Sequence, residues 1–208
     1  DPERPFARLQ PALVLDAVEA LGLRVDGRLL ALNSYENRVY RVGIEPVSLR
    51  VRDPRALPHA VVAKFYRAQR WSDAQIREEH AFTLELAEAE LAVAAPLVLE
   101  GDSLHQFEGF RFTLFECWPG GSPELDAPEH RAMLGRTLGR LHRVGARRAF
   151  RSRPSISDWQ HGDRARRRVL ELRIIPEPLD ERYAEASAAL VAAIRSRAQL
   201  LSQSRMQR

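Results

Sequence analysis

The amino-acid sequence predicts an α+β fold, in which a five-stranded antiparallel sheet with one long helix precedes a helical second part. Two observations support this prediction. Short runs rich in β-branched and aromatic residues alternate with polar turns in the first part of the chain, and helical periodicity dominates after residue 128. The chain has 208 residues, of which 45% are hydrophobic and 29% charged, so it can bury a core and is not disordered as a whole.

Composition also excludes several classes of protein. A single cysteine, Cys117, cannot form an internal disulfide, and no apolar run approaches the roughly 18 residues of a membrane span, which excludes a channel or transporter. The polar opening residues carry no leader pattern, so we expect a cytoplasmic protein without a membrane partner. The net charge of +4 is concentrated in an arginine-rich last third, but no nucleic-acid-binding motif accompanies it, and nucleic acid is an unlikely partner.

The first part of the chain shows a clear order of elements. A short helix is predicted at about 11–22, followed by strands at 28–33, 37–43 and 61–66 and by a helix at about 73–90. The polar residues between the first two strands suit a hairpin turn. Ser72 or Asp73 can cap the start of the long helix.

The remaining elements follow the same logic. Strands are predicted at 96–99 and 109–116 around a hairpin at Glu100-Gly101-Asp102, and helices at 128–144, about 158–172 and about 180–201. No internal repeat and no cluster of metal-ligating residues interrupts this pattern.

Lys64 is the only lysine among 32 Lys and Arg residues. A GC-rich codon preference explains why lysine is scarce, but not where the remaining lysine lies, in the apolar strand 61–66. A site shaped for a compact ammonium does not accept a broad guanidinium, so we predict that Lys64 has a function. Chance retention is the alternative.

Glu79 shares a helical stripe with the apolar Ile76, Phe82 and Leu86. A carboxylate on such a stripe needs a cationic partner, unless it lies at a partly exposed boundary. The neighbouring carboxylates are expected to be solvated: Glu78, Glu85 and Glu88. His80 is not predicted to ligate a metal with Glu79, because adjacent helix positions face apart.

A hairpin, a strand carrying Ala-Lys and a helix offering an inward glutamate resemble the amino-terminal lobe of the protein-kinase-like fold. Four segments look more narrowly like bacterial stress response kinase A, a family grouped with the aminoglycoside and choline phosphotransferases: Leu32–Tyr40, Val62–Arg67, Arg70–Ser72 and Glu78–Phe82. The resemblance runs from about Pro11 to about Leu179. It implies an ATP- and Mg²⁺-dependent Ser/Thr protein kinase of the cytoplasm, with an unknown protein substrate.

The resemblance also implies site residues. Lys64 becomes the ATP-binding lysine and Glu79 its helix partner. The first turn consists of Ser34, Tyr35, Glu36 and Asn37 and occupies the position at which kinases have a phosphate-covering loop. It contains no glycine, and its residues are also consistent with a simple tight turn. The hinge residues are candidates by position, since backbone groups hold adenine there: Phe115, Glu116, Cys117 and Trp118. Cys117 suits a small buried hydrophobe equally well.

One motif resembles the start of a catalytic loop but lacks a residue that the loop requires. His161-Gly162-Asp163 matches the opening of the phosphotransferase loop, but Arg168 stands where a metal-binding Asn is required, and a cation cannot ligate Mg²⁺. Asp163 is therefore not expected to be the catalytic base. The resemblance instead places the catalytic Asp and the metal-binding Asn and Asp beyond residue 208.

The predicted organisation is a kinase-like lobe at 1–116, a hinge at 117–124 and a partial helical lobe at 125–208. Without the catalytic loop, we expect a truncated kinase that holds nucleotide weakly and transfers phosphate poorly. Two other functions stay open. One is a small-molecule phosphotransferase with the same lobe, and the other is a non-catalytic, nucleotide-binding pseudokinase module.

Overall fold

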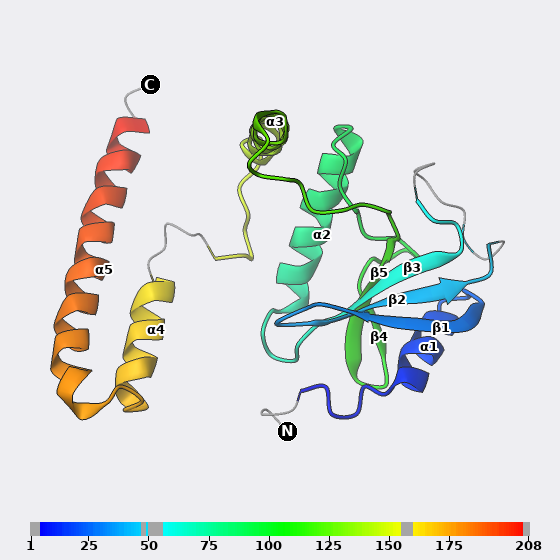
Figure 1. Ribbon diagram of the computed structural model, residues 1–208, viewed down its shortest axis with the longest axis horizontal. Coiled ribbons are helices and arrows are strands. Elements are labelled where there is room, and N and C mark those ends of the chain that lie inside the picture. Colours follow the sequence, from blue (N-terminus) through cyan, green and yellow to red (C-terminus); the bar gives the residue numbers. More distant parts are fainter. Residues whose placement is uncertain (1–4, 47–48, 50–55, 155–159, 206–208) are drawn as a thin grey trace. The chain divides into compact units, whose positions relative to one another are not determined.

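A computed structural model describes residues 5–46, 49, 56–154 and 160–205. Two compact units make up the chain, Asp1–Ser152 and Arg153–Arg208. In the described residues, the sheet and three helices belong to the first unit and two helices belong to the second (Figure 1).

The first unit follows the predicted order of elements, and the long helix is flanked by strands. Its elements are α1 (Pro11–Glu19), β1 (Val25–Leu32), β2 (Arg38–Ile44), β3 (Ala60–Phe65), α2 (Asp73–Glu88), β4 (His105–Phe107), β5 (Phe110–Glu116) and α3 (Pro128–Gly145). The strands form one antiparallel sheet in the order β1-β2-β3-β5-β4. The α+β class and the five-stranded antiparallel sheet are confirmed.

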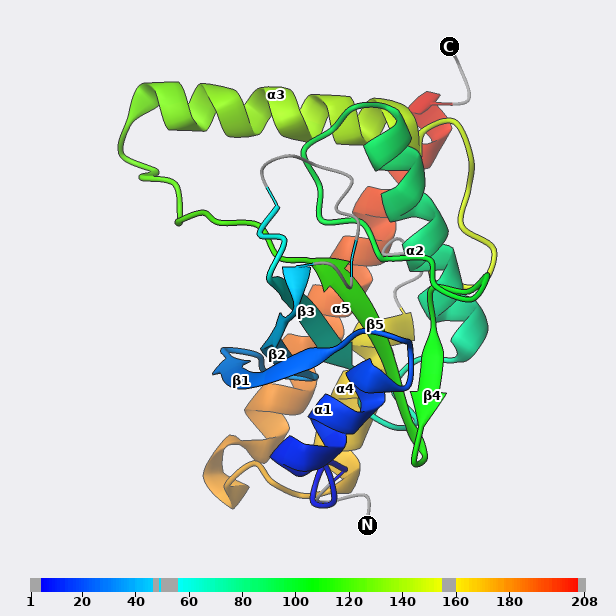
Figure 2. The same cartoon turned by 90° about the vertical axis from the view of Figure 1, so that its right-hand side faces the viewer.

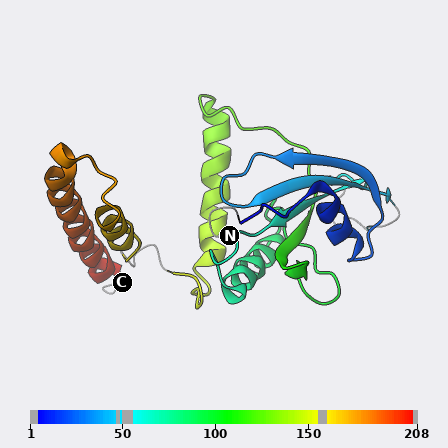
Figure 3. The same ribbon diagram turned by 90° about the horizontal axis from the view of Figure 1, so that it is seen from below.

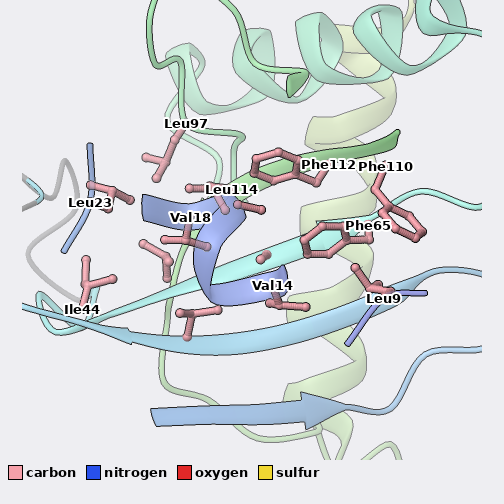
Figure 4. Close-up of a cluster of buried hydrophobic side chains, with 14 residues drawn as sticks. Leu9, Val14, Val18, Leu23, Ile44, Phe65, Leu97, Phe110, Phe112 and Leu114 are labelled. Carbon is pink, nitrogen blue, oxygen red and sulfur yellow. The ribbon is translucent and has the colours of Figure 1, made fainter. Parts of the chain in front are cut away.

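One face of the sheet is buried against α1. Val14 and Val18 of α1 are completely buried and pack on Val42, Phe65 and Leu114 of the three central strands (Figure 4). The rings of Phe65 and Phe112 are stacked with their centroids 5.2 Å apart. Burial of each such side chain stabilises the fold by about 1.5–3 kcal/mol, which makes this cluster the main source of stability of the unit.

Helix α2 lies on the opposite face of the sheet from α1, and its C-terminal part meets the end of α3 (Figures 1 and 2). Its start is fixed locally by a capping box. The Ser72 hydroxyl accepts the Gln75 backbone N–H at 3.3 Å, and the Gln75 side chain accepts the Ser72 backbone N–H at 2.9 Å. These bonds satisfy backbone donors that the first helical turn leaves unpaired, so of the two predicted caps the structure uses Ser72.

The predicted strand at 96–99 is wrong. Pro96 and Leu99 form only isolated bridges, and the edge strand beside β5 is β4. The predicted tight turn at Glu100-Gly101-Asp102 does form, since Glu100 and Gly101 have positive φ and Leu99 and Asp102 exchange two backbone hydrogen bonds. The hairpin within the sheet, between β4 and β5, turns at Glu108-Gly109, both also with positive φ. A two-residue turn with positive φ matches the twist of paired strands, and Pro96 lacks the N–H that a ladder position requires.

The second unit is a helix pair, α4 (Gln160–Glu171) and α5 (Glu177–Arg205), close to the predicted boundaries. Arg166 joins the two helices, because its Nε donates to Ser187 Oγ at 3.0 Å. Asp163 forms an ion pair with Arg195. None of the described helices is long and apolar enough to cross a membrane.

Replacing Ser72 with alanine removes the acceptor of the capping box. We expect Ser72→Ala to lower the free energy of unfolding by about 1 kcal/mol, measured by urea denaturation. Ser122→Ala, at an exposed position before α3, is the matched control and should change stability by much less. Equal losses in both variants would show that the cap does not stabilise α2.

Candidate functional site

Lys64 and Glu79 meet on the face of the sheet opposite the α1 core. Lys64 lies on β3 and Glu79 on α2, and Lys64 Nζ is 3.3 Å from Glu79 Oε1. The ammonium also lies 4.8 Å from the centroid of the Tyr66 ring. The two charged side chains are 23% and 34% exposed, and an ion pair open to solvent contributes only about 0–1 kcal/mol. The pair thus positions an amine but does not by itself hold α2 in place.

An apolar surface surrounds this amine. Residues paired across an antiparallel sheet share a face, and the register gives two neighbouring rows: Leu32, Val39, Lys64 and Thr113, and then Leu30, Arg41, Val62 and Phe115. Leu30 and Leu32 remain 49% and 36% exposed, although they are large hydrophobic residues. The apolar members of these rows, Leu30, Leu32, Val39, Val62 and Phe115, form an apolar strip beside the Lys64 ammonium, interrupted by Arg41 in the second row.

A cavity of about 340 Å³ opens along β1 to β3, with Leu30 and Arg41 among its lining residues. Lys64 does not line it and lies one cross-strand row away. Sequence patterns did not single out Leu30, Leu32, Val39 or Val62 as site residues. The alternation of β-strands would have found Val62, two positions from Lys64, but the partners on β1 and β2 depend on the register.

The turn at Ser34–Asn37 lies at the tip of the β1–β2 hairpin, beyond the row that contains Lys64. The Ser34 hydroxyl donates to the Asn37 carbonyl at 2.7 Å, which closes the turn without a glycine. Glu36 forms an ion pair with Arg70, and the Asn37 side chain accepts the Arg67 backbone N–H at 3.3 Å. The loop between β3 and α2 thus holds the tip, while Tyr35 is fully exposed.

Of the four predicted hinge residues, Phe115 and Glu116 are the last residues of β5, and Cys117 and Trp118 follow the strand. Phe115 belongs to the apolar strip, whereas Glu116 is buried and accepts the Trp118 indole N–H at 3.4 Å. The Cys117 carbonyl accepts the Leu57 backbone N–H at 2.7 Å. Burial raises the pKa of the Cys117 thiol, so it stays protonated and behaves as a small hydrophobe.

Buried hydrogen bonds of His80 link α2 to the sheet and to the segment after residue 100. His80 is only 2% exposed, and its Nε2 lies 2.7 Å from the Tyr66 hydroxyl while its Nδ1 lies 2.8 Å from Ser103 Oγ. Desolvation lowers the pKa of His80 to about 4, so the ring is neutral at pH 7. A neutral imidazole has one donor and one acceptor nitrogen, and both hydroxyls can serve either role. Sequence patterns did not reveal this role of His80, although His80 follows the buried Ile76 by one helical turn.

Ion pairing adds a second link between α2 and the segment after residue 100. Arg77 Nη2 lies 2.8 Å from Asp102 Oδ2, and the guanidinium lowers the pKa of that carboxyl well below its usual range. The backbone N–H groups of Ser103 and Leu104 also donate to Asp102. Asp102 thereby joins the turn that carries Ser103 to the helix that carries His80.

The outer side of α2 is held by the chain that follows α3, which corrects the expectation that Glu78 and Glu85 are solvated (Figure 3). Glu78 accepts the backbone N–H groups of Arg151 and Ser152, the latter at 2.8 Å. Glu85 pairs with Arg148 at 3.1 Å. These partners are more than 60 residues away in the sequence, so helical periodicity alone did not reveal them. Glu88 is exposed, as expected.

The described residues contain no group of three His, Cys, Asp or Glu side chains placed to hold a metal ion. Around Lys64 the carboxylate in contact is Glu79, which the ammonium occupies. This donor set does not fit Mg²⁺, which requires several oxygen ligands in octahedral geometry. Asp163 pairs with Arg195, and the side chain of His161 lies outside the described residues.

The model of the family described as "Phosphotransferase enzyme family" matches residues 28–203. The chain belongs to this family. Over 189 residues it is 38% identical to "Stress response kinase A" of Salmonella choleraesuis and to "Serine/threonine protein kinase RdoA" of Salmonella typhimurium, and 37% identical to "Stress response kinase A" of Escherichia coli K12. Each match covers 91% of this chain and 54% of the relative, so the chain spans about half the length of these relatives.

A solved kinase structure has a similar fold. It is described as "Amicoumacin kinase hAmiN in complex with AMP-PNP, Ca2+ and Ami", and it superposes with a TM-score of 0.56 at 19% identity, covering 82% of this chain and 55% of the other. The protein-kinase-like α+β fold and the resemblance to stress response kinase A are thus confirmed.

The buried His80 predicts how stability depends on pH. Its pKa is lowered from 6.5 to about 4, so the unfolded chain binds the proton more tightly and stability falls as pH decreases between these values. We expect the free energy of unfolding to fall by up to roughly 3 kcal/mol in this window. Urea denaturation between about pH 7 and pH 4 measures it.

His80→Gln should flatten most of this dependence and lower stability at pH 7. A smaller part should persist, because burial also lowers the pKa of His105. His142→Gln, at an exposed position on α3, is the matched control and should keep the full dependence. An unchanged pH profile in His80→Gln would contradict the assignment.

Proposed function

We propose that this chain is the nucleotide-binding portion of an ATP-dependent Ser/Thr protein kinase of the stress response kinase A type. The observation that carries the proposal is the Lys64–Glu79 ion pair, which holds an amine at the border of the apolar strip on the open face of the sheet. A nucleotide has a planar base, which can stack on an apolar surface, and a negatively charged phosphate chain, which requires a positive charge nearby.

Each part of the nucleotide has a matching surface in this proposal. Adenine stacks on the strip that contains Val39, Val62 and Phe115, and the backbone near Glu116 to Trp118 contacts its edge. Lys64 binds the phosphates through charge-assisted hydrogen bonds, while Glu79 keeps the ammonium in place. The hairpin tip, with Ser34, Tyr35, Glu36 and Asn37, covers the phosphates.

The organisation proposed is a nucleotide-binding lobe at 1–116, a hinge at 117–124 and part of a helical lobe at 125–208. The donor set around Lys64 does not fit Mg²⁺, so the metal ligands and the catalytic Asp are assigned to the further length that the relatives have. Phosphoryl transfer depends on positioning and charge neutralisation. This portion alone therefore supplies binding without efficient transfer, in the cytoplasm of the cell.

The second candidate is a small-molecule phosphotransferase. The family model and the amicoumacin kinase structure favour it, since that protein was solved with a small molecule named in its description. The relatives at 37–38% identity favour the protein kinase instead. A non-catalytic pseudokinase module is the third candidate, and it predicts nucleotide binding without turnover in any longer form.

Calorimetric titration with ATP and Mg²⁺ tests the binding site. Lys64→Met should weaken ATP binding about tenfold or more, because it removes charge-assisted hydrogen bonds worth about 1.5–3 kcal/mol. Glu79→Gln should weaken it less, since the amine remains. The matched controls are Arg136→Met and Glu88→Gln, both at exposed positions, and should bind as the parent chain does. Equal affinity in Lys64→Met and its control would refute the proposed site.

Phosphate transfer in a protein of the relatives' full length tests the substrate class. We expect label from radioactive ATP to appear on serine or threonine of protein substrates and to disappear with Lys64→Met. Label on aminoglycosides or choline but not on protein would establish the second candidate. Nucleotide binding with no transfer to either would establish the third.

A further inference from the structure

A second cavity, of about 680 Å³, lies at one end of the sheet among three segments of the first unit. The segments are the chain before α1, the loop between β3 and α2, and the turn between β4 and β5, which passes close to the chain before α1 (Figure 1). Four arginines line it: Arg8, Arg67, Arg70 and Arg111. Lys64 does not line this cavity, and Phe110 in its wall packs in the α1 core on the other face of the sheet.

Two of the four guanidinium groups already have anionic partners. Arg111 Nη1 lies 2.7 Å from Asp73 Oδ1 and donates to the Trp71 carbonyl at 2.9 Å. Arg70 pairs with Glu36 of the hairpin tip. These bonds fix the positions of both groups and leave their net charge close to zero.

Arg8 and Arg67 have no such partner. Within the described part of the chain, no carboxylate lies within ion-pair distance of either guanidinium. Arg8 lies over the Phe110 ring, 5.7 Å from its centroid, and Arg67 contacts the hairpin tip through its backbone N–H. The cavity therefore carries an uncompensated charge of about two positive units between walls that include the buried rings of Tyr66 and Phe110.

This arrangement has the properties of an anion site. Guanidinium groups form paired hydrogen bonds with phosphate. Arg8 and Arg67 are both exposed and line the same concave surface, so their donors are accessible to an anion that enters it. The volume is within the usual range for small ligands, about 300–1,000 Å³. A ligand with two linked phosphates would neutralise both arginines at once.

We propose that this cavity binds the phosphate groups of a small soluble ligand, through Arg8 and Arg67, at a site separate from Lys64. The proposal goes beyond the proposed function and does not depend on it. Tyr66 lines the cavity and also contacts the Lys64 ammonium, so a test has to distinguish the two places.

Titration of the full 208-residue chain with pyrophosphate, followed by calorimetry at constant ionic strength, tests this proposal. Arg8→Gln and Arg67→Gln should each weaken binding about tenfold, the loss expected for one charge-assisted contact. Arg136→Gln, on the exposed surface of α3, is the matched control and should leave affinity unchanged. Lys64→Met removes any pyrophosphate binding at the proposed nucleotide site, so binding that remains in this variant and is lost when Arg67→Gln is added reports the arginine cavity.

Three results would overturn the proposal. They are the absence of pyrophosphate binding at millimolar concentration, an equal loss in Arg136→Gln, and a loss confined to Lys64→Met. Circular dichroism shows whether each variant folds. Should Arg8→Gln unfold, Arg67→Gln decides the matter, because the Arg67 side chain is exposed and its contact with the hairpin tip comes from the backbone.

Discussion

The placement of α2 against the sheet is the constraint on which the candidate site depends. Lys64 meets Glu79 only if this helix keeps both its rotation and its distance from β3. A partly exposed ion pair of this kind is too weak to impose that geometry. On the inner side of α2, the helix is held by the hydrogen bonds of the buried His80 and by the ion pair between Arg77 and Asp102. On its outer side, Glu78 accepts a hydrogen bond from the chain after α3. The charged pair is thus a result of helix placement rather than its cause.

The sheet serves two purposes because its strands alternate. On β3, Ala63 and Phe65 face the α1 core, while Val62 and Lys64 face the open side. The core face supplies the stability and fixes the register, and the register then sets which residues of β1, β2 and β5 lie beside Lys64. A change of one residue in register would move the lysine to the core face, so the core and the candidate site are specified together.

The chain belongs to the phosphotransferase family, so these features can be compared with the requirements of phosphoryl transfer. In phosphoryl transfer the protein contributes mainly by positioning groups and neutralising charge. In the proposed function, the positioning elements among the described residues are the lysine, its glutamate and the apolar strip. The described residues contain no carboxylate cluster for a metal ion. The arginine cavity at one end of the sheet adds a second region of positive charge, which the proposed nucleotide site does not explain.

The sequence by itself determined the features that depend on neighbours along the chain. Strand alternation, the Ser72 cap and the stripe through Glu79 are local, and they were sufficient to predict the α+β class and to select Lys64. The edge strand was wrongly predicted at 96–99 instead of at β4, because an edge strand is determined by its pairing with β5. Only the tertiary structure showed the role of His80, the partners of Glu78 and the cavity arginines. Each of these depends on segments far apart in the sequence, and their meeting is decided by packing and register rather than by local pattern.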